Sequence, residues 1–286
     1  MFSPPKPDQA ELETLQVRIA NAIARLKSLR DGDAGFVELV GLGPDVVPPL
    51  RRLLFEPEPS GLHQVRGRAA EALGALGAFD VLADFLVCRR PIADPVERLG
   101  EEVVIGAAAR AISRLREEWV FLLLAVLAAH RCISGVLAGL GSFHRKDSIG
   151  IFIDALGEDE TRLTAETILC GFGRAARPAL IAAAHDRDNA NRSENESQLR
   201  KRRSALGVLL EIGIPRKKWL VLRPLMEDSD RQIALLACRF CFQFGSGQDL
   251  ARCATHLIDL RSGADWLECE LIDELLKAIK SASLAD

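Results

Sequence analysis

Residues 66–77 read RGRAAEALGALG, residues 162–173 read RLTAETILCGFG, and residues 202–213 read RRSALGVLLEIG. In each stretch an Arg is followed by Ala at offset 3, Leu at offset 7, another large apolar residue at offset 10 and Gly at offset 11. Offsets 3, 7 and 10 fall on one face of an α-helix, and the final Gly suits the left-handed position that ends a helix. This pattern predicts a recurring buried helix with a recurring stop, which is typical of an α-solenoid.

Weaker copies of the pattern begin at residues 105, 130 and 234. With the three strong copies they give starts that are 25 to 40 residues apart, which is the spacing of two-helix repeats. A second element follows the glycines, because Pro48 and Pro178 each stand five positions after a Gly. Since Pro is tolerated in the first turn of a helix, each of these prolines predicts the first helix of the next pair.

The run Gly173, Ala176, Pro178, Leu180, together with the Arg-x-x-Ala that opens the second helix, resembles HEAT repeats. It is most similar to the short variant found in phycobilisome lyase-type proteins, and the resemblance covers roughly residues 36–260. The resemblance implies an all-α fold: an α-solenoid of about six or seven HEAT-type antiparallel helix pairs with helical caps. It also implies binding of another protein, because HEAT proteins mostly act as scaffolds.

The predicted organisation is a flexible N-terminus over residues 1–10 and a single HEAT-repeat solenoid over residues 11–286. A polar insert at 186–197 is predicted to be mobile, since it has almost no apolar residue. A second interruption, residues 88–101, contains two prolines and is predicted to be an extended loop.

The composition limits the classes of partner. The chain has 286 residues, 48% of them hydrophobic, and a net charge of -3, so no general positive field attracts nucleic acid. The longest apolar run, residues 119–129, is about half as long as a membrane span requires. We therefore predict that this run forms a buried helix, that the protein does not enter the membrane and that it is cytoplasmic.

No motif for chemistry stands out. Most of the seven cysteines lie in apolar helical stretches, which favours reduced, buried thiols. The Cys238–Cys241 pair has the CxxC spacing, but no second pair completes a zinc set. The chain contains no His-Glu dipeptide, P-loop or nucleophile motif. We therefore predict no catalytic residue, no metal and no cofactor.

Two alternatives to a scaffold stay open. Arg200 to Arg203 and Arg216 to Lys218 form a basic cluster over residues 200–218, which could contact phosphates in a nucleic-acid-binding or DNA-repair protein. The negative net charge disfavours this alternative, and Trp219 begins an apolar run that predicts a core position. The resemblance implies the other alternative, a phycobilisome lyase-like enzyme or chaperone.

We predict that the partner binds the concave face of the solenoid, which the second helices line. The contact residues are then the exposed positions of these helices, beside the apolar face. The predicted partner-binding residues are Arg68, Glu71, Thr164, Thr167, Arg200 and Arg203. The partner itself and the oligomeric state are not predicted.

The repeated Arg of the pattern has a structural interpretation. Side chains at repeat positions serve stacking first, so we expect Arg66, Arg162 and Arg202 to pair with an acid or a carbonyl of a neighbouring repeat. For Arg162, the nearby Asp159 is the expected partner within the turn.

Overall fold

The computed structural model describes residues 9–56, 63–88, 92–187 and 194–283. Within these residues the regular structure is entirely helical, with helices α1 to α16 and no strand. The predicted all-α class is therefore confirmed. The helices form two compact units, an N-terminal unit of residues 1–143 and a C-terminal unit of residues 144–286. The single array predicted over residues 11–286 and the predicted repeat count stay predictions.

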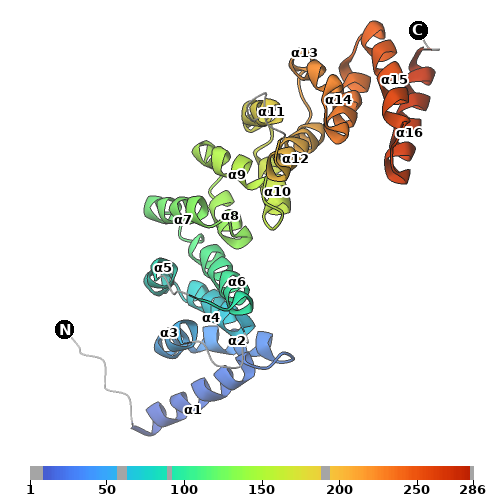
Figure 1. The fold of residues 1–286 in the computed structure, drawn as a ribbon. Coiled ribbons are helices and arrows are strands. Elements are labelled where there is room, and N and C mark those ends of the chain that lie inside the picture. The colour runs from blue at the N-terminus through green and yellow to red at the C-terminus, as the bar shows by residue number, and fades with distance from the viewer. Residues whose placement is uncertain (1–8, 57–62, 89–91, 188–193, 284–286) are drawn as a thin grey trace. The chain divides into compact units, whose positions relative to one another are not determined.

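The N-terminal unit is built from eight helices in its described residues. They are α1 (Gln9–Leu26), α2 (Gly32–Leu42), α3 (Val47–Phe55), α4 (His63–Ala75), α5 (Phe79–Val87), α6 (Pro95–Ile112), α7 (Glu118–His130) and α8 (Ser134–Gly141). Consecutive helices pair as α3 with α4, α5 with α6 and α7 with α8, while α4 packs on α6 and α6 packs on α8. Two layers result, a first-helix layer of α3, α5 and α7 and a second-helix layer of α4, α6 and α8 (Figure 1).

The C-terminal unit repeats this scheme. Its helices are α9 (Ile149–Ala155), α10 (Arg162–Phe172), α11 (Arg177–His185), α12 (Glu196–Ile212), α13 (Trp219–Leu222), α14 (Arg231–Phe244), α15 (Gly247–Arg261) and α16 (Trp266–Ser283). The second helices pack on one another in the order α10, α12, α14 and α16. Each also packs on a first helix: α10 on α9, α12 on α11 and α16 on α15, while α14 packs mainly on the 3₁₀ turn that follows α13. Each unit is therefore a stack of antiparallel helix pairs.

The repeated pattern forms the core as predicted. The Ala at offset 3 and the Leu at offset 7 are fully buried in all three strong copies. The final glycines Gly77, Gly173 and Gly213 have φ values of 75°, 53° and 67°. Only Gly adopts this left-handed backbone without a Cβ penalty, so the glycine ends each helix where the sequence places it.

Small residues bring the second helices of the N-terminal unit close together. A Cβ added to Gly139 of α8 would lie 2.7 Å from the carbonyl oxygen of Ala109 on α6. At Gly74 of α4 it would lie 2.7 Å from the Cβ of Ala111. These contacts leave no room for a side chain, because protein interiors are close-packed. The Ala- and Gly-rich composition thus sets the spacing of this layer.

Two of the repeated arginines join neighbouring repeats in the same way. Arg66 is 4% exposed, and its Nε donates to the carbonyl oxygen of Leu54 at 2.9 Å while its guanidinium binds Glu101 on α6. Arg202 is completely buried and its Nε donates to the carbonyl oxygen of Ala184 at 3.0 Å. In both cases the carbonyl lies in the last turn of the preceding first helix, so each Arg satisfies a helix end that would otherwise lack a donor.

The third repeated arginine departs from this arrangement. Arg162 pairs with Glu166 one turn along its own helix, at 3.7 Å. Its expected partner Asp159 binds Arg200 instead, at 3.0 Å. In place of an arginine, the Thr161 hydroxyl donates to the carbonyl oxygen of Ala155 at 3.1 Å. The predicted Arg162–Asp159 pair is therefore wrong, because Asp159 binds Arg200 and Arg162 binds Glu166.

The interruptions predicted from sequence had mixed outcomes. The loop predicted over residues 88–101 is wrong in its second half, because α6 begins at Pro95. Asp94 caps this helix by accepting from the backbone N–H groups of Val96 and Glu97, and Pro suits the first helical position. Most of the predicted flexible stretch 1–10, and residues 188–193 of the predicted insert 186–197, lie outside the described residues.

Candidate functional site

The outward side of α7 carries a stripe of exposed apolar side chains. Trp119, Leu122 and Val126 are 41%, 53% and 54% exposed. Their spacing of three and four residues places them on one face of the helix. No charged residue lies between Glu118 and His130, so solvated side chains do not interrupt this surface. We call these three residues the α7 stripe.

The opposite side of α7 explains why the helix is held in place. Val120 and Leu124 are fully buried, and Phe121 lies edge-to-face with Phe143 at 5.7 Å between ring centroids. The helix is thus apolar on both its buried and its exposed side. The prediction that residues 119–129 form a buried helix is wrong in this respect, because a first helix in a two-layer stack buries only one side.

Other exposed apolar groups lie on helices that also carry charges. Val96, Leu99 and Val103 on α6 are exposed and have the same spacing of three and four residues, but that helix also carries Glu97, Arg98 and Glu102. Leu267 and Leu271 on α16 likewise lie among Glu268 and Glu270. The α7 stripe differs from these groups because its helix has no charged residue between Glu118 and His130. Contiguous patches of this kind mark interaction sites more often than isolated exposed residues do.

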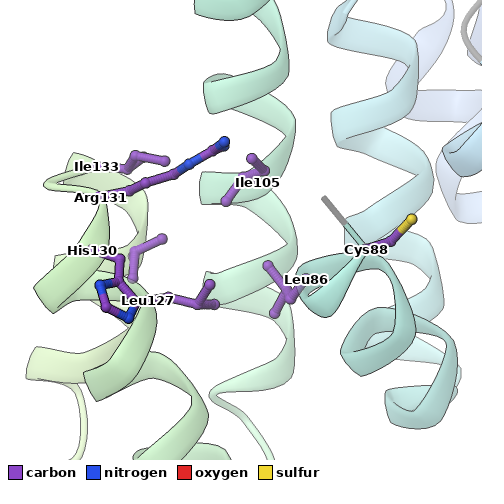
Figure 2. A pocket seen from close by; sticks show the side chains of 8 residues that line it. Leu86, Cys88, Ile105, Leu127, His130, Arg131 and Ile133 are labelled. Carbon is purple, nitrogen blue, oxygen red and sulfur yellow. The ribbon is translucent and has the colours of Figure 1, made fainter. Parts of the chain in front are cut away.

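A small cavity lies beside the C-terminal end of α7. It has a volume of about 80 Å³ and apolar lining from Leu86 of α5, Ile105 of α6, Leu127 of α7, and Ile133 and Val136 at α8. Cys88, His130 and Arg131 complete the lining. Figure 2 shows the Arg131 side chain extending from the α7–α8 connection toward Ile105. His130 and Leu127 lie on the side of the cavity from which the Arg131 side chain starts.

Arg131 is the charged group at this cavity. Its side chain is exposed, and within the described residues no carboxylate lies at ion-pair distance from its guanidinium. This differs from Arg66 and Arg202, which are both neutralised by acids. The cavity thus combines an apolar interior with a cation that remains available to a ligand.

The cavity is not arranged for nucleophilic catalysis. Figure 2 shows the sulfur of Cys88 directed away from His130, whereas a Cys–His pair needs hydrogen-bond contact between the two side chains. Within the described residues there is also no group of three or more His, Cys, Asp or Glu side chains that could hold a metal ion.

The thiols divide by burial. Cys238 and Cys241 of α14 and Cys253 of α15 are fully buried, and we call them the buried thiols. The contact with Cys238, reinforced by burial, raises the pKa of the Cys253 thiol to about 12, which disfavours the reactive thiolate. Cys88 is exposed and the other three are half-buried, so the predicted burial of most cysteines is only partly right.

Of the two predicted contact residues in the N-terminal unit, Arg68 serves internal packing. Arg68 donates to the backbone carbonyl of Ser28 at 3.1 Å and lies 3.4 Å from the Asp33 carboxylate. It therefore ties α4 to the chain between α1 and α2. Glu71 is half-buried on the same helix. Their role in partner binding stays a prediction.

The predicted contact residues of the C-terminal unit fall in two places. Thr164 is half-buried, and Thr167 is exposed with its hydroxyl donating to the Leu163 carbonyl at 2.9 Å. Arg200 and Arg203 lie on α12. Arg200 binds Asp159 at 3.0 Å, and Arg203 binds Asp230. The structure does not join the threonines and arginines into one site through any described contact.

The basic cluster is largely neutralised. Besides Arg200 and Arg203, Lys201 binds Asp154 at 3.0 Å, and the Arg202 guanidinium binds Asp228 and Glu194. The remaining cations, Arg216 to Lys218, are exposed. Trp219 is 2% exposed, which confirms its predicted core position and removes it as a base-stacking platform.

Sequence reasoning missed the α7 stripe, although a signal was available. The eleven apolar residues of 119–129 are too few for a membrane span. They are also too uniformly apolar for the first helix of a repeat, whose outer side normally carries polar residues. That combination indicates an exposed apolar face. The lining of the cavity comes from four separate helices, so no local motif marked it.

Comparisons with known proteins found a match among solved structures. No protein-family model matches the chain, and no curated protein matches it. Among solved structures, the chain is similar to the complex of CpcE and CpcF of phycocyanin lyase from Nostoc sp. PCC7120. The identity is 20% over 91% of this chain and 97% of that chain, with a TM-score of 0.34. At this level the likeness carries no statement about activity or partners.

Proposed function

We propose that this protein is a non-catalytic protein-interaction scaffold of the HEAT-repeat type and that it works in the cytoplasm. In this proposal the α7 stripe is its main contact surface. The observation that carries the proposal is the exposure of Trp119, Leu122 and Val126 on a helix face without charges.

Energetics support this assignment. Burying exposed apolar surface contributes about 25 cal/mol per Å², and Trp is enriched among the residues that dominate binding energy. A partner that covers the α7 stripe would remove from water three large apolar side chains that are 41% to 54% exposed. An apolar helix face presented to a groove or helix of the partner is a common recognition mode.

The charge distribution supports a protein partner over nucleic acid. The basic residues 200–203 are paired with acids of the same unit, and the chain has a net charge of -3. Phosphate binding requires cations that are free to replace counterions. No helix among the described residues has the length and apolarity needed to cross a membrane.

Affinity capture with matched variants tests the proposal. The tagged wild-type protein is compared with Leu122→Glu, which places a charge in the α7 stripe, and with Val37→Glu. Val37 is 68% exposed on α2 of the same unit and is an isolated apolar residue, so its variant controls for an added surface charge. Captured proteins are quantified by mass spectrometry from nuclease-treated native lysate.

We expect Leu122→Glu to lose a stoichiometric partner that wild type and Val37→Glu both retain. Circular dichroism should show the same helicity for all three proteins, because both replaced side chains are largely exposed. Partners that persist with Leu122→Glu and also with Trp119→Glu would refute the α7 stripe as the contact surface. Partners that disappear with nuclease would favour the basic residues 216–218 instead.

A further inference from the structure

We propose that the cavity at the end of α7 is an anchor site for one branched aliphatic side chain of a protein partner, and that Arg131 binds a carboxylate next to that side chain. The proposed ligand is therefore an acidic segment with a central leucine or isoleucine. This inference rests on the proposed scaffold function and specifies the chemistry of its partner.

The size of the cavity limits its occupant. A volume of about 80 Å³ is far below the roughly 300 to 1,000 Å³ of sites for cofactors and drug-sized ligands. It is also smaller than the apolar cavity of about 150 Å³ that holds benzene. It exceeds the space of one water molecule, and its walls are formed mainly by Leu, Ile and Val side chains. A short aliphatic side chain matches both the volume and the apolar lining.

The charge of Arg131 at the cavity favours an acidic residue beside the aliphatic side chain of the ligand. Arg131 is exposed and has no carboxylate partner among the described residues, and a guanidinium binds carboxylates in a planar, two-bond geometry. The chain as a whole has a net charge of -3, so an acidic segment is not attracted by a general positive field. Attraction at this point therefore depends on Arg131.

The cavity and the α7 stripe share α7, and the cavity adjoins the last residue of the stripe along this helix. Leu127, which lines the cavity, directly follows Val126 of the stripe, and His130 lies one turn beyond Val126. One partner segment can therefore insert its aliphatic side chain into the cavity while the adjoining surface covers the stripe. Small deep anchors surrounded by a broader apolar contact are typical of strong protein interfaces.

Methyl NMR titration with defined peptides tests the anchor. The full chain, labelled at Ile, Leu and Val methyl groups, is titrated to millimolar concentration with a short capped peptide that has Glu-Leu-Asp at its centre. Control peptides replace Leu by Ala, or both acids by their amides. We expect selective shifts of the Ile105, Leu127, Ile133 and Val136 methyl signals. The Ala peptide should bind about tenfold more weakly, since most of the buried apolar side chain is lost.

Protein variants separate the two parts of the anchor. Arg131→Gln should weaken the Glu-Leu-Asp peptide by about twofold to fivefold and abolish the salt dependence of binding. Arg18→Gln, which changes an exposed arginine on α1, should leave both unchanged. Ile133→Phe, which fills the cavity, should abolish the cavity shifts. If that variant fails to fold, the peptide series and Arg131→Gln still decide the outcome.

Several results would overturn the inference. These are the absence of cavity shifts at millimolar peptide, equal binding of the Ala peptide, and equal binding of the amide peptide. Cavity signals that shift with protein concentration alone would identify a second copy of this chain as the occupant and would also overturn it. If the peptides fail while Leu122→Glu still releases the captured partner, only the anchor is wrong. If Leu122→Glu releases nothing while the peptide binds, the contact surface proposed above is wrong.

Discussion

Replacing Arg202 by Met should destabilise the C-terminal unit strongly. Arg202 is completely buried on α12. Its Nε donates to the Ala184 carbonyl at 3.0 Å, and one guanidinium nitrogen lies 2.9 and 2.7 Å from the two Glu194 oxygens. The other nitrogen binds Asp228, whose side chain is also completely buried. One substitution therefore removes contacts to α11, to the start of α12 and to the segment before α14.

The size of the effect follows from what is left behind. Removing one partner of a buried ion pair costs about 3 to 5 kcal/mol, because the other charge stays buried without compensation. Here Asp228 keeps the Arg187 guanidinium and accepts from the Asp230 backbone N–H at 2.9 Å. We therefore expect a loss near the lower limit, about 3 kcal/mol.

The matched control is Arg252→Met in the same unit. Arg252 binds Glu227 at 3.2 Å, but the two side chains are 56% and 71% exposed. Exposed pairs contribute about 0.2 to 1 kcal/mol. Urea unfolding followed by Trp219 fluorescence, in a Trp119→Phe and Trp266→Phe background, reports on the C-terminal unit alone. Equal losses of unfolding free energy for Arg202→Met and Arg252→Met would refute the reasoning that burial makes the Arg202 network stabilising.

Three further outcomes are expected. Burial alone would raise the pKa of the Asp228 carboxyl, but the Asp230 backbone N–H and the two bound guanidiniums hold this pKa below its ordinary value. The ionised carboxylate therefore stabilises the folded state above about pH 4, and this stabilisation is lost as the pH falls through the lower folded-state pKa. Urea midpoints measured against pH test this expectation, and a midpoint that stays unchanged down to pH 2 would contradict it. Gly139→Ala should cost about 1 to 3 kcal/mol, because its Cβ would meet the α6 backbone at 2.7 Å, whereas Gly207→Ala on α12 meets no atom within 4 Å and should stabilise by about 0.5 to 1 kcal/mol. Thermal unfolding compares the two, and a loss for both would argue against the close approach. In the native protein, Ellman's reagent should modify Cys88 rapidly and the buried thiols only after urea unfolding; a single rate for all thiols would contradict their assigned burial.

The second-helix pattern was predictable because it depends on local geometry. The glycines at offset 11 have a role that follows from backbone freedom alone, and Arg66 and Arg202 at offset 0 were expected to contact a neighbouring carbonyl or acid because side chains at repeat positions serve stacking. The structure confirms both roles. Arg162 shows the limit of such reasoning, because the Asp159 carboxylate that was its expected partner binds Arg200 of the next repeat instead.

The candidate surface was less predictable. The sequence marked residues 119–129 as an apolar helix but could not say which side of that helix faces solvent. The predicted site residues Arg68, Arg200 and Arg203 were expected to be exposed, yet each is half-buried and engaged by an acid of its own unit. Pairing of this kind joins residues that are 27 to 41 positions apart, which a local pattern does not encode.

By itself, the sequence determined that this protein is a stack of antiparallel helix pairs, because hydrophobic periodicity and helix-ending glycines act over a few residues. Tertiary structure alone decided which cations are neutralised and which apolar side chains stay exposed. It placed Arg131 beside a cavity formed by Leu86, Ile105, Leu127 and Val136. The physical reason is that charge neutralisation and burial depend on side chains that meet only after the repeats have packed.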